Sequence, residues 1–340
     1  MPLVTTIIPA FNASRTIAET IGSALAQTHA EHEIVVVDDG STDATRAIVS
    51  AIAQRHPNIC IVGQENRGLA SARNAGIAAA RGDYIAPLDA DDLWHPEKLA
   101  RQLAAIDARP SAALAYGWFR NIDPHNRVLP GSGAPVAEGW VYHRHLDQNF
   151  ISNGSAPLVR TDVAREIGYD PTLSRGCEDY MFQLQVARRY QFACVRGWLM
   201  GYRRTPGSMS TGVLRMIDAH LQMYALLLPD ADPDARAIIA RQVARLQVER
   251  ARNRWRRGLL GEGADALGRA IATDPAAAAG AIGAQLRLAL ERARKGMFPS
   301  PARPFSDYAL DEPDGTWFSG RSPARDAALA ELDARIGPVG

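Results

Sequence analysis

Three aspartates in the segment LDADD, residues 88–92, have the type and spacing of a metal site. They follow a strand-like run at its carboxyl end. Asp89 and Asp91 are two residues apart, so in extended backbone their side chains point to the same side. Converging carboxylates repel each other unless a cation lies between them, and hard oxygen ligands suit Mg²⁺ or Mn²⁺ bound to phosphates. The alternative for so short a motif is an acidic loop that precedes a helix.

Side chains that can bind a nucleotide follow the other strand-like runs. Asp38 and Asp39, in DDGS, can accept a hydrogen bond from a base N–H or a ribose hydroxyl; a turn that caps a helix is the alternative. Phe11, in PAFN, offers a ring face to a nucleobase, although a core phenylalanine is the commoner case. Arg73, in LASARNAG, can bind a diphosphate through two nitrogens or lie solvated on a helix.

The elements that must position these residues alternate between strands and helices. β-Branched runs predict strands, and segments of helical period follow them. The strands are expected at 3–8, 33–37, 59–63 and 83–88, and the helices at 14–27, 42–54, 70–80 and 97–106. Buried strands joined by crossover helices predict an α/β, Rossmann-like, mostly parallel sheet with ligand loops at the strand carboxyl ends. We expect this half to cover residues 1–110.

The pattern changes after residue 110 and again near residue 212. Strand-like runs and one helix, at about 178–190, predict an α+β half over residues 111–212. Those runs lie at 113–119, 156–160 and 193–203. From 213 to 340 the sequence is rich in Ala and Arg and predicts a helical C-terminal region.

Composition excludes several classes of protein. The 340 residues suit one large domain or two smaller ones. A net charge of +1 gives no global reason to expect nucleic-acid binding. Three scattered cysteines, none in a CxxC pair, argue against a disulfide framework and a structural zinc site. The N-terminus has no signal-peptide pattern, and no apolar run reaches the roughly 20 residues that span a bilayer. We expect a cytoplasmic protein.

Five motifs in register resemble those of family 2 glycosyltransferases. They are PAFN, VVVDDGS, NRGLASARNAGI, GDYIAPLDADD and GCEDY, and the resemblance covers about residues 3–210. It implies a GT-A fold and inverting transfer of a sugar from a nucleoside diphosphate, in the first instance UDP, to an acceptor hydroxyl. Residues 1–212 would then form the GT-A domain, with a nucleotide-sugar-binding half at 1–110 and an acceptor-binding half at 111–212. The implied acceptor is a saccharide or a lipid-linked saccharide of bacterial cell-surface polysaccharide or glycolipid synthesis.

The resemblance also implies roles for residues that contact the donor. Pro9 and Phe11 would line the nucleoside pocket, and Phe11 replaces a tyrosine common in the family. Asp39 would bond the base, with Asp38 beside it. Arg73 would face the base or the diphosphate.

The metal and the catalytic base follow from the same resemblance. Asp91 would ligate Mg²⁺ or Mn²⁺, and Asp89 would touch the ribose or a metal-bound water. Asp179, in GCEDY, would be the catalytic base; the alternative is a first-turn acid favoured by the helix dipole. Some relatives complete the metal site with a later histidine. The corresponding stretch here, 202–210, has none, so Arg203 or Arg204 is the candidate to neutralise the diphosphate.

Two regions are candidates for partner binding. Residues 130–160, with Trp140, Asn153 and Gly154, are expected to recognise the acceptor. The family's processive members carry a QxxRW motif and membrane spans; neither occurs here, which favours the addition of one or a few sugars.

The basic helix 250–257, centred on Trp255, fits either peripheral contact with the inner face of a membrane or a solvated face with ion pairs. The competing function for the whole chain is a non-catalytic sugar-nucleotide-binding or scaffold protein whose C-terminal helices recruit partners. The oligomeric state is not indicated by the sequence.

Overall fold

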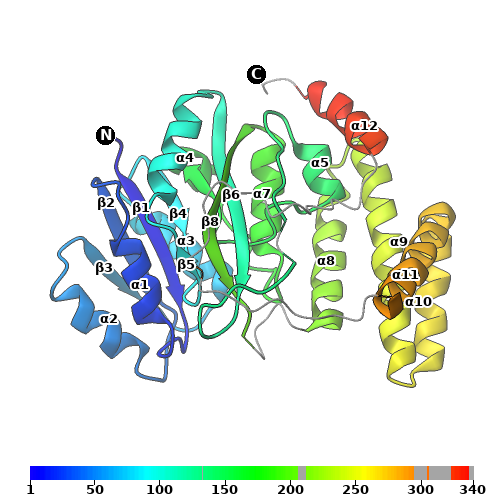
Figure 1. Ribbon diagram of the computed structural model, residues 1–340, viewed down its shortest axis with the longest axis horizontal. Coiled ribbons are helices and arrows are strands. Elements are labelled where there is room, and N and C mark those ends of the chain that lie inside the picture. Colours follow the sequence, from blue (N-terminus) through cyan, green and yellow to red (C-terminus); the bar gives the residue numbers. More distant parts are fainter. Residues whose placement is uncertain (132, 206–211, 295–304, 306–322, 337–340) are drawn as a thin grey trace.

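The computed structural model describes residues 1–131, 133–205, 212–294, 305 and 323–336. These residues contain a sheet with the strand order β3-β2-β1-β4-β7-β6-β8-β5, which helices flank (Figure 1). Its strands are β1 Val4–Ala10, β2 His32–Asp38, β3 Ile59–Gly63, β4 Tyr84–Pro87, β5 Leu93–Trp94, β6 Ala112–Ile122, β7 Leu158–Arg160 and β8 Gln191–Arg203.

The N-terminal half of the sheet is parallel. Strands β3, β2, β1 and β4 pair in the same direction, so their carboxyl ends lie at one edge. Strand β1 is buried along its whole length, as strands covered on both faces are. The helices of this half are α1 Ile17–Leu25, α2 Thr45–Ala53, α3 Leu69–Ala79 and α4 Lys98–Asp107. Helix α3 lies directly on β1: a Cβ on Gly76 would come within 2.2 Å of Ile7 Cγ2.

The second half of the sheet is mixed. Strand β7 runs antiparallel to both β4 and β6, while β8 runs parallel to β6. The short strand β5 immediately follows the LDADD segment and pairs antiparallel with β8, Leu93 opposite Gly201. This half carries helices α5 Tyr142–Asp147, α6 Thr161–Ile167 and α7 Glu178–Ala187. The LDADD segment is therefore fixed at both ends by the sheet.

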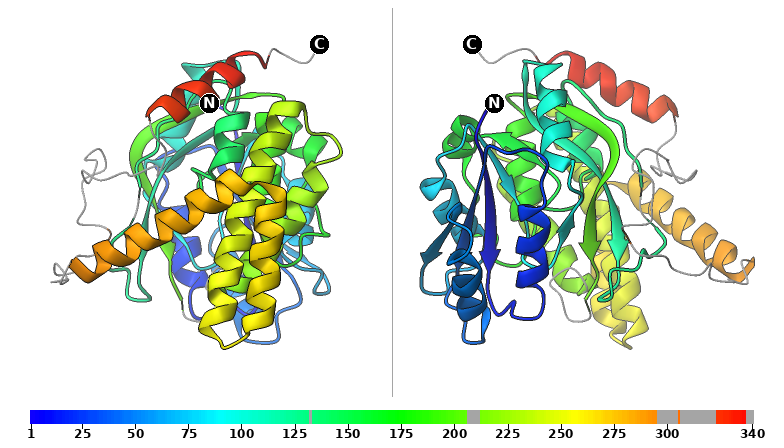
Figure 2. Two further views of the ribbon diagram at one scale, coloured as in Figure 1. Left: turned by 90° about the vertical axis from the view of Figure 1, so that its right-hand side faces the viewer. Right: turned by 60° about the vertical axis from the view of Figure 1, so that its left-hand side comes forward.

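The C-terminal helices stand at one end of the molecule (Figures 1 and 2). They are α8 Val213–Leu227, α9 Pro233–Arg256, α10 Leu260–Thr273, α11 Pro275–Arg294 and α12 Pro323–Ala334. Helices α9 and α10 form a hairpin, and Asp232 caps α9 by accepting a hydrogen bond from the backbone N–H of Ala235. Among the described residues, we find no helix with the length and apolarity to cross a membrane.

The hydrophobic core extends from the sheet into α8 and the first half of α9. Met223, Tyr224, Ile238 and Ile239 belong to the same buried cluster as the strands. A small separate cluster joins the later part of α9 to α10 and α11. The boundary expected at residue 212 stays a prediction, and the core is continuous across it.

The predicted α/β sheet with a helical C-terminal region is confirmed, and the differences concern short elements. Strand β5 and helices α5 and α6 are absent from the prediction. A strand of two residues is too short to show alternation, and helices of six and seven residues make too few turns to show the helical period. Such short helices depend on tertiary packing rather than on their own sequence.

Candidate active site

Side chains join the loops at the carboxyl edge of the parallel strands. Asn12 follows β1 with a positive φ of 50°, and its Oδ1 accepts a hydrogen bond from the N–H of Thr42 at 2.8 Å. Asp39 follows β2, and its two oxygens accept hydrogen bonds from the N–H groups of Arg67 and Gly68, both at 2.9 Å. These hydrogen bonds hold the loops that follow β1, β2 and β3 in fixed positions relative to one another, without a ligand.

Asp38 and Asp39 have different surroundings. Asp38 accepts a hydrogen bond from the N–H of Ser41 and pairs with Arg46. Although burial opposes the effect, these partners hold the pKa of Asp38 below its ordinary value. Asp39 also accepts from Gln64 Nε2 at 2.7 Å. A carboxylate offers about four acceptor positions, so Asp39 keeps about one for a ligand.

Phe11 and Pro9 also differ in exposure. Phe11 is 49% exposed beside these loops, so a face of its ring is open to a ligand. Pro9 lies buried within β1, opposite Val37 of β2. Of the two, only Phe11 presents its side chain to solvent.

Asp92 anchors the acidic segment from inside. It is fully buried, and its carboxylate accepts hydrogen bonds from Ser155 Oγ at 2.6 Å and from the N–H of Arg203 at 3.0 Å. Burial, together with the charges of Asp91 and Asp89, raises the pKa of Asp92 well above its ordinary value. Ser155 Oγ in turn accepts a hydrogen bond from the N–H of Asp89. Of the three aspartates, this one has a structural role.

Asp89 and Asp91 are the candidate metal ligands. Asp89 Oδ1 pairs with an amino nitrogen of Arg73 at 2.6 Å, which leaves Oδ2 available. In the part of the chain that the structure describes, no hydrogen-bond donor of another residue reaches the Asp91 carboxylate. Burial and the charge of Asp89 raise the pKa of Asp91 to about 6. A partly buried carboxylate without a donor, next to a second carboxylate, fits a divalent cation.

These two residues alone do not complete a metal site. The described residues contain no group of three or more candidate His, Cys, Asp or Glu ligands. The remaining ligands of a cation at Asp91 would therefore be water and phosphate oxygens, as Mg²⁺ commonly has.

Arg73 connects the two halves of the sheet. Its guanidinium is buried, donates to Asp89 and to Glu178 Oε1 at 2.8 Å, and lies 5.2 Å from the centre of the Tyr169 ring. Gly154 leaves the room for it, because a Cβ there would come within 2.3 Å of an Arg73 amino nitrogen. Despite burial, the two carboxylates raise the pKa of Arg73 further.

Asp179 lies in the first turn of α7, next to Glu178. Its side chain is partly exposed and accepts a hydrogen bond from the N–H of Tyr180 at 2.8 Å. Burial raises the pKa of Asp179, while Arg73 opposes the shift. The preceding Cys177 has a φ of 69° and contacts His220 of α8, Sγ to Nδ1 3.3 Å. Asp89, Arg73, Glu178 and Asp179 thus form one continuous charged group.

Arg203 is a structural residue. It is buried, and its guanidinium donates to the carbonyl of Asp91 at 2.6 Å, to Glu19 at 2.8 Å and to Asn126. Arg204 donates to Asn121. The expectation that Arg203 faces a diphosphate does not fit these contacts, and residues 206–211 of the same stretch lie outside the described residues.

The residues expected to bind the acceptor are also placed. Asn153 is buried and accepts hydrogen bonds from the N–H groups of Ser155 and Ala156. Gly154 faces Arg73, as described above. Trp140 is partly exposed, and its carbonyl accepts a hydrogen bond from Arg144. Asn153 and Gly154 therefore shape the wall around Arg73.

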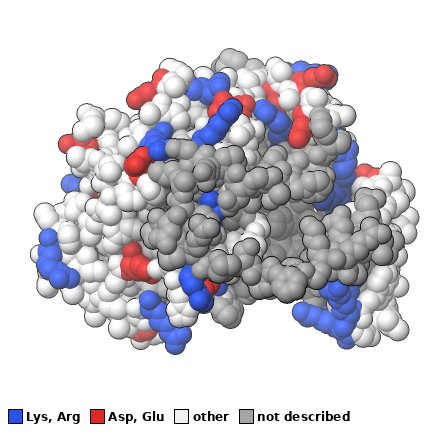
Figure 3. Space-filling model, viewed as in Figure 1, with Lys and Arg blue, Asp and Glu red and all other residues white. Residues whose placement is uncertain are grey.

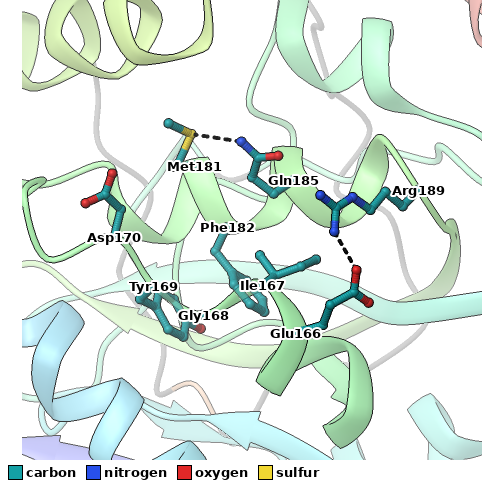
Figure 4. A pocket seen from close by; sticks show the side chains of 9 residues that line it. All are labelled: Glu166, Ile167, Gly168, Tyr169, Asp170, Met181, Phe182, Gln185 and Arg189. Atoms are coloured by element: carbon teal, nitrogen blue, oxygen red, sulfur yellow. Dashed lines mark hydrogen bonds and ion pairs between the residues drawn. The ribbon is translucent and has the colours of Figure 1, made fainter. Parts of the chain in front are cut away.

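A cavity of about 280 Å³ lies between α6 and α7 (Figure 4). Tyr169, which lies against Arg73, also lines this cavity and stacks on Phe182 with ring centres 4.4 Å apart. An ion pair between Arg189 and Glu166 lies at its rim.

Sequence reasoning missed Tyr169 and Ser155, since no local pattern signals a contact with a residue some 60 to 100 positions away.

The N-terminal part of the chain is similar to known proteins. The sequence model of Glycosyl transferase family 2 matches residues 5–159. This stretch, less than half of the chain, is therefore similar to the glycosyltransferases of family 2. The chain is 48% identical over 109 residues to the succinoglycan biosynthesis protein ExoO of Rhizobium meliloti, a match that covers 32% of this chain and 31% of that protein.

Other curated relatives match stretches of similar length. Chondroitin synthase of Escherichia coli is 37% identical over 129 residues, 38% of this chain and 19% of the relative. The putative teichuronic acid biosynthesis glycosyltransferase TuaG of Bacillus subtilis is 42% identical over 118 residues, 34% of this chain and 47% of the relative. The matched segment thus spans less than half the length of each of these proteins.

The similarity to solved structures covers more of the chain than residues 5–159, and it confirms the GT-A fold. A mannosyltransferase from Pyrobaculum calidifontis, in complex with GDP-Man and Mn²⁺, superposes with a TM-score of 0.59 at 25% identity, over 84% of this chain and 81% of that one. S. aureus TarS 1–349, in complex with UDP-GlcNAc, gives a TM-score of 0.57 at 21% identity over 70% of each chain.

Proposed function

We propose that this protein is an inverting glycosyltransferase that moves a sugar from a nucleoside diphosphate to an acceptor hydroxyl. One observation carries the proposal: a single buried arginine, Arg73, bridges the acidic segment after β4 and the acidic start of α7. The bridge joins the segment that carries our candidate metal ligand, Asp91, to the helix that carries our candidate base, Asp179, which supports a shared site. The two halves of the sheet contribute one each.

The donor would lie across the loops at the carboxyl edge. The exposed ring of Phe11 offers a stacking face for the base, and the remaining acceptor position of Asp39 suits a base N–H. Uracil has such an N–H, but so does guanine, and the two similar structures hold UDP-GlcNAc and GDP-Man. A UDP-sugar is our first choice of donor.

Asp91 and Asp89 would hold Mg²⁺ or Mn²⁺, whose chemistry is to stabilise the negative charge of the leaving diphosphate. Arg73 is held in place by its ion pairs with Asp89 and Glu178. It adds a positive charge beside Asp89 and lies between the carboxylates of Asp89 and Glu178. Arg203 donates a hydrogen bond to the Asp91 carbonyl, and its backbone N–H donates to the buried Asp92 carboxylate. With the backbone held in this way, we expect the Asp91 side chain to face the ligand.

Asp179 would take the proton from the acceptor hydroxyl. Its raised pKa makes it a better proton acceptor than an ordinary aspartate. A single displacement inverts the anomeric centre, so an α-linked donor gives a β-linked product. The relatives' names, succinoglycan and teichuronic acid biosynthesis, support a bacterial surface polysaccharide or glycolipid as the acceptor. We propose that transfer takes place at the cytoplasmic side of the membrane.

The first test is a thermal-shift screen of nucleotide sugars with and without Mn²⁺, since a ligand of the native state raises its melting temperature. We expect a shift with one nucleotide sugar that is larger when Mn²⁺ is present. The absence of a shift with every nucleotide sugar would count against the donor site.

The second test separates catalysis from binding. Asp179→Asn keeps the shape of the side chain but removes its basicity, so we expect the same donor-induced shift and a loss of transfer of at least about 100-fold. Near-normal transfer by this variant rejects Asp179 as the base. Donor binding without transfer by the wild-type chain, to any saccharide or lipid-linked acceptor, would favour the scaffold alternative.

A further inference from the structure

The turn between α9 and α10 carries an exposed apolar group. Side chains are exposed at every position from Trp255 to Glu262; we name residues 254–262 the hairpin tip. Leu260 is 70% exposed, Trp255 41% and Leu259 37%. Large apolar side chains gathered at this exposure mark surfaces that contact something else.

The hairpin tip is an ordered feature. Gly258 turns the chain with a φ of 77°, and the N–H of Leu259 donates to the carbonyl of Arg254. Trp255 Nε1 donates to the carbonyl of Leu260, and the indole lies against Gly263, where a Cβ would clash at 2.2 Å. The leucines are thus held outward by a closed turn.

The same turn is positively charged. Residues 250–265 contain five arginines and two acidic residues. Arg250 pairs with Asp218 and Arg254 with Glu262. Arg256 and Arg257 are exposed, and we find no acidic partner for either within the described residues. Blue side chains gather at the lower right of Figure 3, over the end of the hairpin.

The hairpin tip faces the same way as the proposed transfer site. In Figure 1 the arrowhead of β1, and with it the carboxyl edge, points to the lower side of the molecule. The turn between α9 and α10 lies at that side too, and both views of Figure 2 agree. A surface bound by the tip would therefore lie below the carboxyl edge.

We propose that the hairpin tip docks on an anionic phospholipid bilayer. Leu259 and Leu260 would enter the boundary between headgroups and acyl chains, Trp255 would lie at headgroup level, and Arg256 and Arg257 would bind lipid phosphates. This inference goes beyond sugar transfer and does not depend on it. A second copy of the chain fits less well, because a two-fold contact through so small a patch would bring the unpaired arginines together.

The test is co-sedimentation of the full chain with vesicles, without any sugar donor. Vesicles of phosphatidylcholine alone are compared with vesicles that also contain phosphatidylglycerol, at low and high salt. We expect binding to the anionic vesicles that weakens as salt rises. Since each arginine near such a surface contributes roughly fivefold, we expect R256E/R257E to weaken binding on the order of 20-fold or more. L259S/L260S should weaken binding at both salt concentrations.

Two variants on the same helix serve as controls. Arg269→Glu and Ile271→Ser change exposed residues of α10 outside the tip, and binding should be unchanged. Thermal melts check that every variant is folded. The proposal is overturned if the wild-type chain binds no vesicles at either salt concentration, or if the controls lose as much binding as the tip variants. It is equally overturned if light scattering shows a dimer that L259S/L260S abolishes while vesicle binding persists.

Discussion

At the scale of single residues, the acidic segment separates neighbours of the same type into different roles. Asp92 has two hydrogen-bond donors and faces the core. Among the described residues, no donor of another residue reaches the Asp91 carboxylate, and its burial and the charge of Asp89 outweigh the attraction of Arg203. A charged group held without partners costs stability, and such costs are typical of positions kept for a ligand. The sequence motif alone shows the three aspartates as equals.

The Asp91 side chain therefore has a measurable effect on stability. Its pKa rises from 3.8 to about 6 on folding. The native state thus holds its proton more tightly, and the destabilisation is absent below the unfolded pKa, grows as pH rises and is complete above about pH 6. Asp91→Asn should raise the free energy of unfolding by on the order of 3 kcal/mol at neutral pH. The gain should be roughly half as large at pH 5.

Denaturant unfolding of both proteins at the two pH values, without metal, checks this expectation. Asp89→Asn is the comparison, because it removes an ion pair with Arg73 and should destabilise. The same Asp91→Asn protein should lose the Mn²⁺-dependent part of the donor shift. An unchanged or lowered stability at neutral pH contradicts the assignment.

At the scale of elements, the sequence predicts the long, repeated units and misses the short, dependent ones. Strands β1 to β4 and helices α1 to α4 have enough residues to display a period, and their order predicts the parallel half. The burial of Arg73 was not predictable, because it needs Glu178, 105 residues away, and the space left by Gly154. The positions of Asp39, Asp91 and Asp179 could be predicted from motifs; their partners could not, since hydrogen bonds across distant loops leave no local pattern.

The segment 150–155 is expected to control the site through Arg73. Gly154→Ala places a methyl group where the guanidinium lies, and the two ion pairs leave the guanidinium little freedom to move. Overpacking of this kind costs about 1–3 kcal/mol, and we expect a loss of transfer larger than the loss of stability would explain. Gly22→Ala is the control, since nothing lies within 4 Å of its Cβ position. Steady-state kinetics measure the loss of transfer in each variant, and thermal melts measure the loss of stability. Equal losses in Gly154→Ala and Gly22→Ala would reject the role of Gly154.

At the scale of the whole molecule, the sheet and the first C-terminal helices share one core. Apolar side chains of α8 and the first half of α9 pack with the strands, so a chain ending at residue 212 leaves their neighbours exposed to water. We expect that chain to aggregate or to melt without cooperativity, and a chain ending at residue 256 to keep a cooperative melt at a lower temperature. Calorimetry of both compares them. A cooperative melt of the shorter chain at the full-length temperature would establish residues 1–212 as an independent domain.

The acidic segment and the strand that stabilises it, β8, are synthesised at different times. Arg203, which holds the Asp91 carbonyl and Asp92, lies 112 residues after Asp91. A ribosome adds roughly 5–20 residues per second. Arg203 is therefore synthesised roughly 5–20 s after the acidic segment that it stabilises. During that interval the edge of β4 is open until β7 arrives, and open strand edges invite pairing with other chains. The nascent protein thus exposes an unpaired strand edge while the LDADD segment next to it is already synthesised.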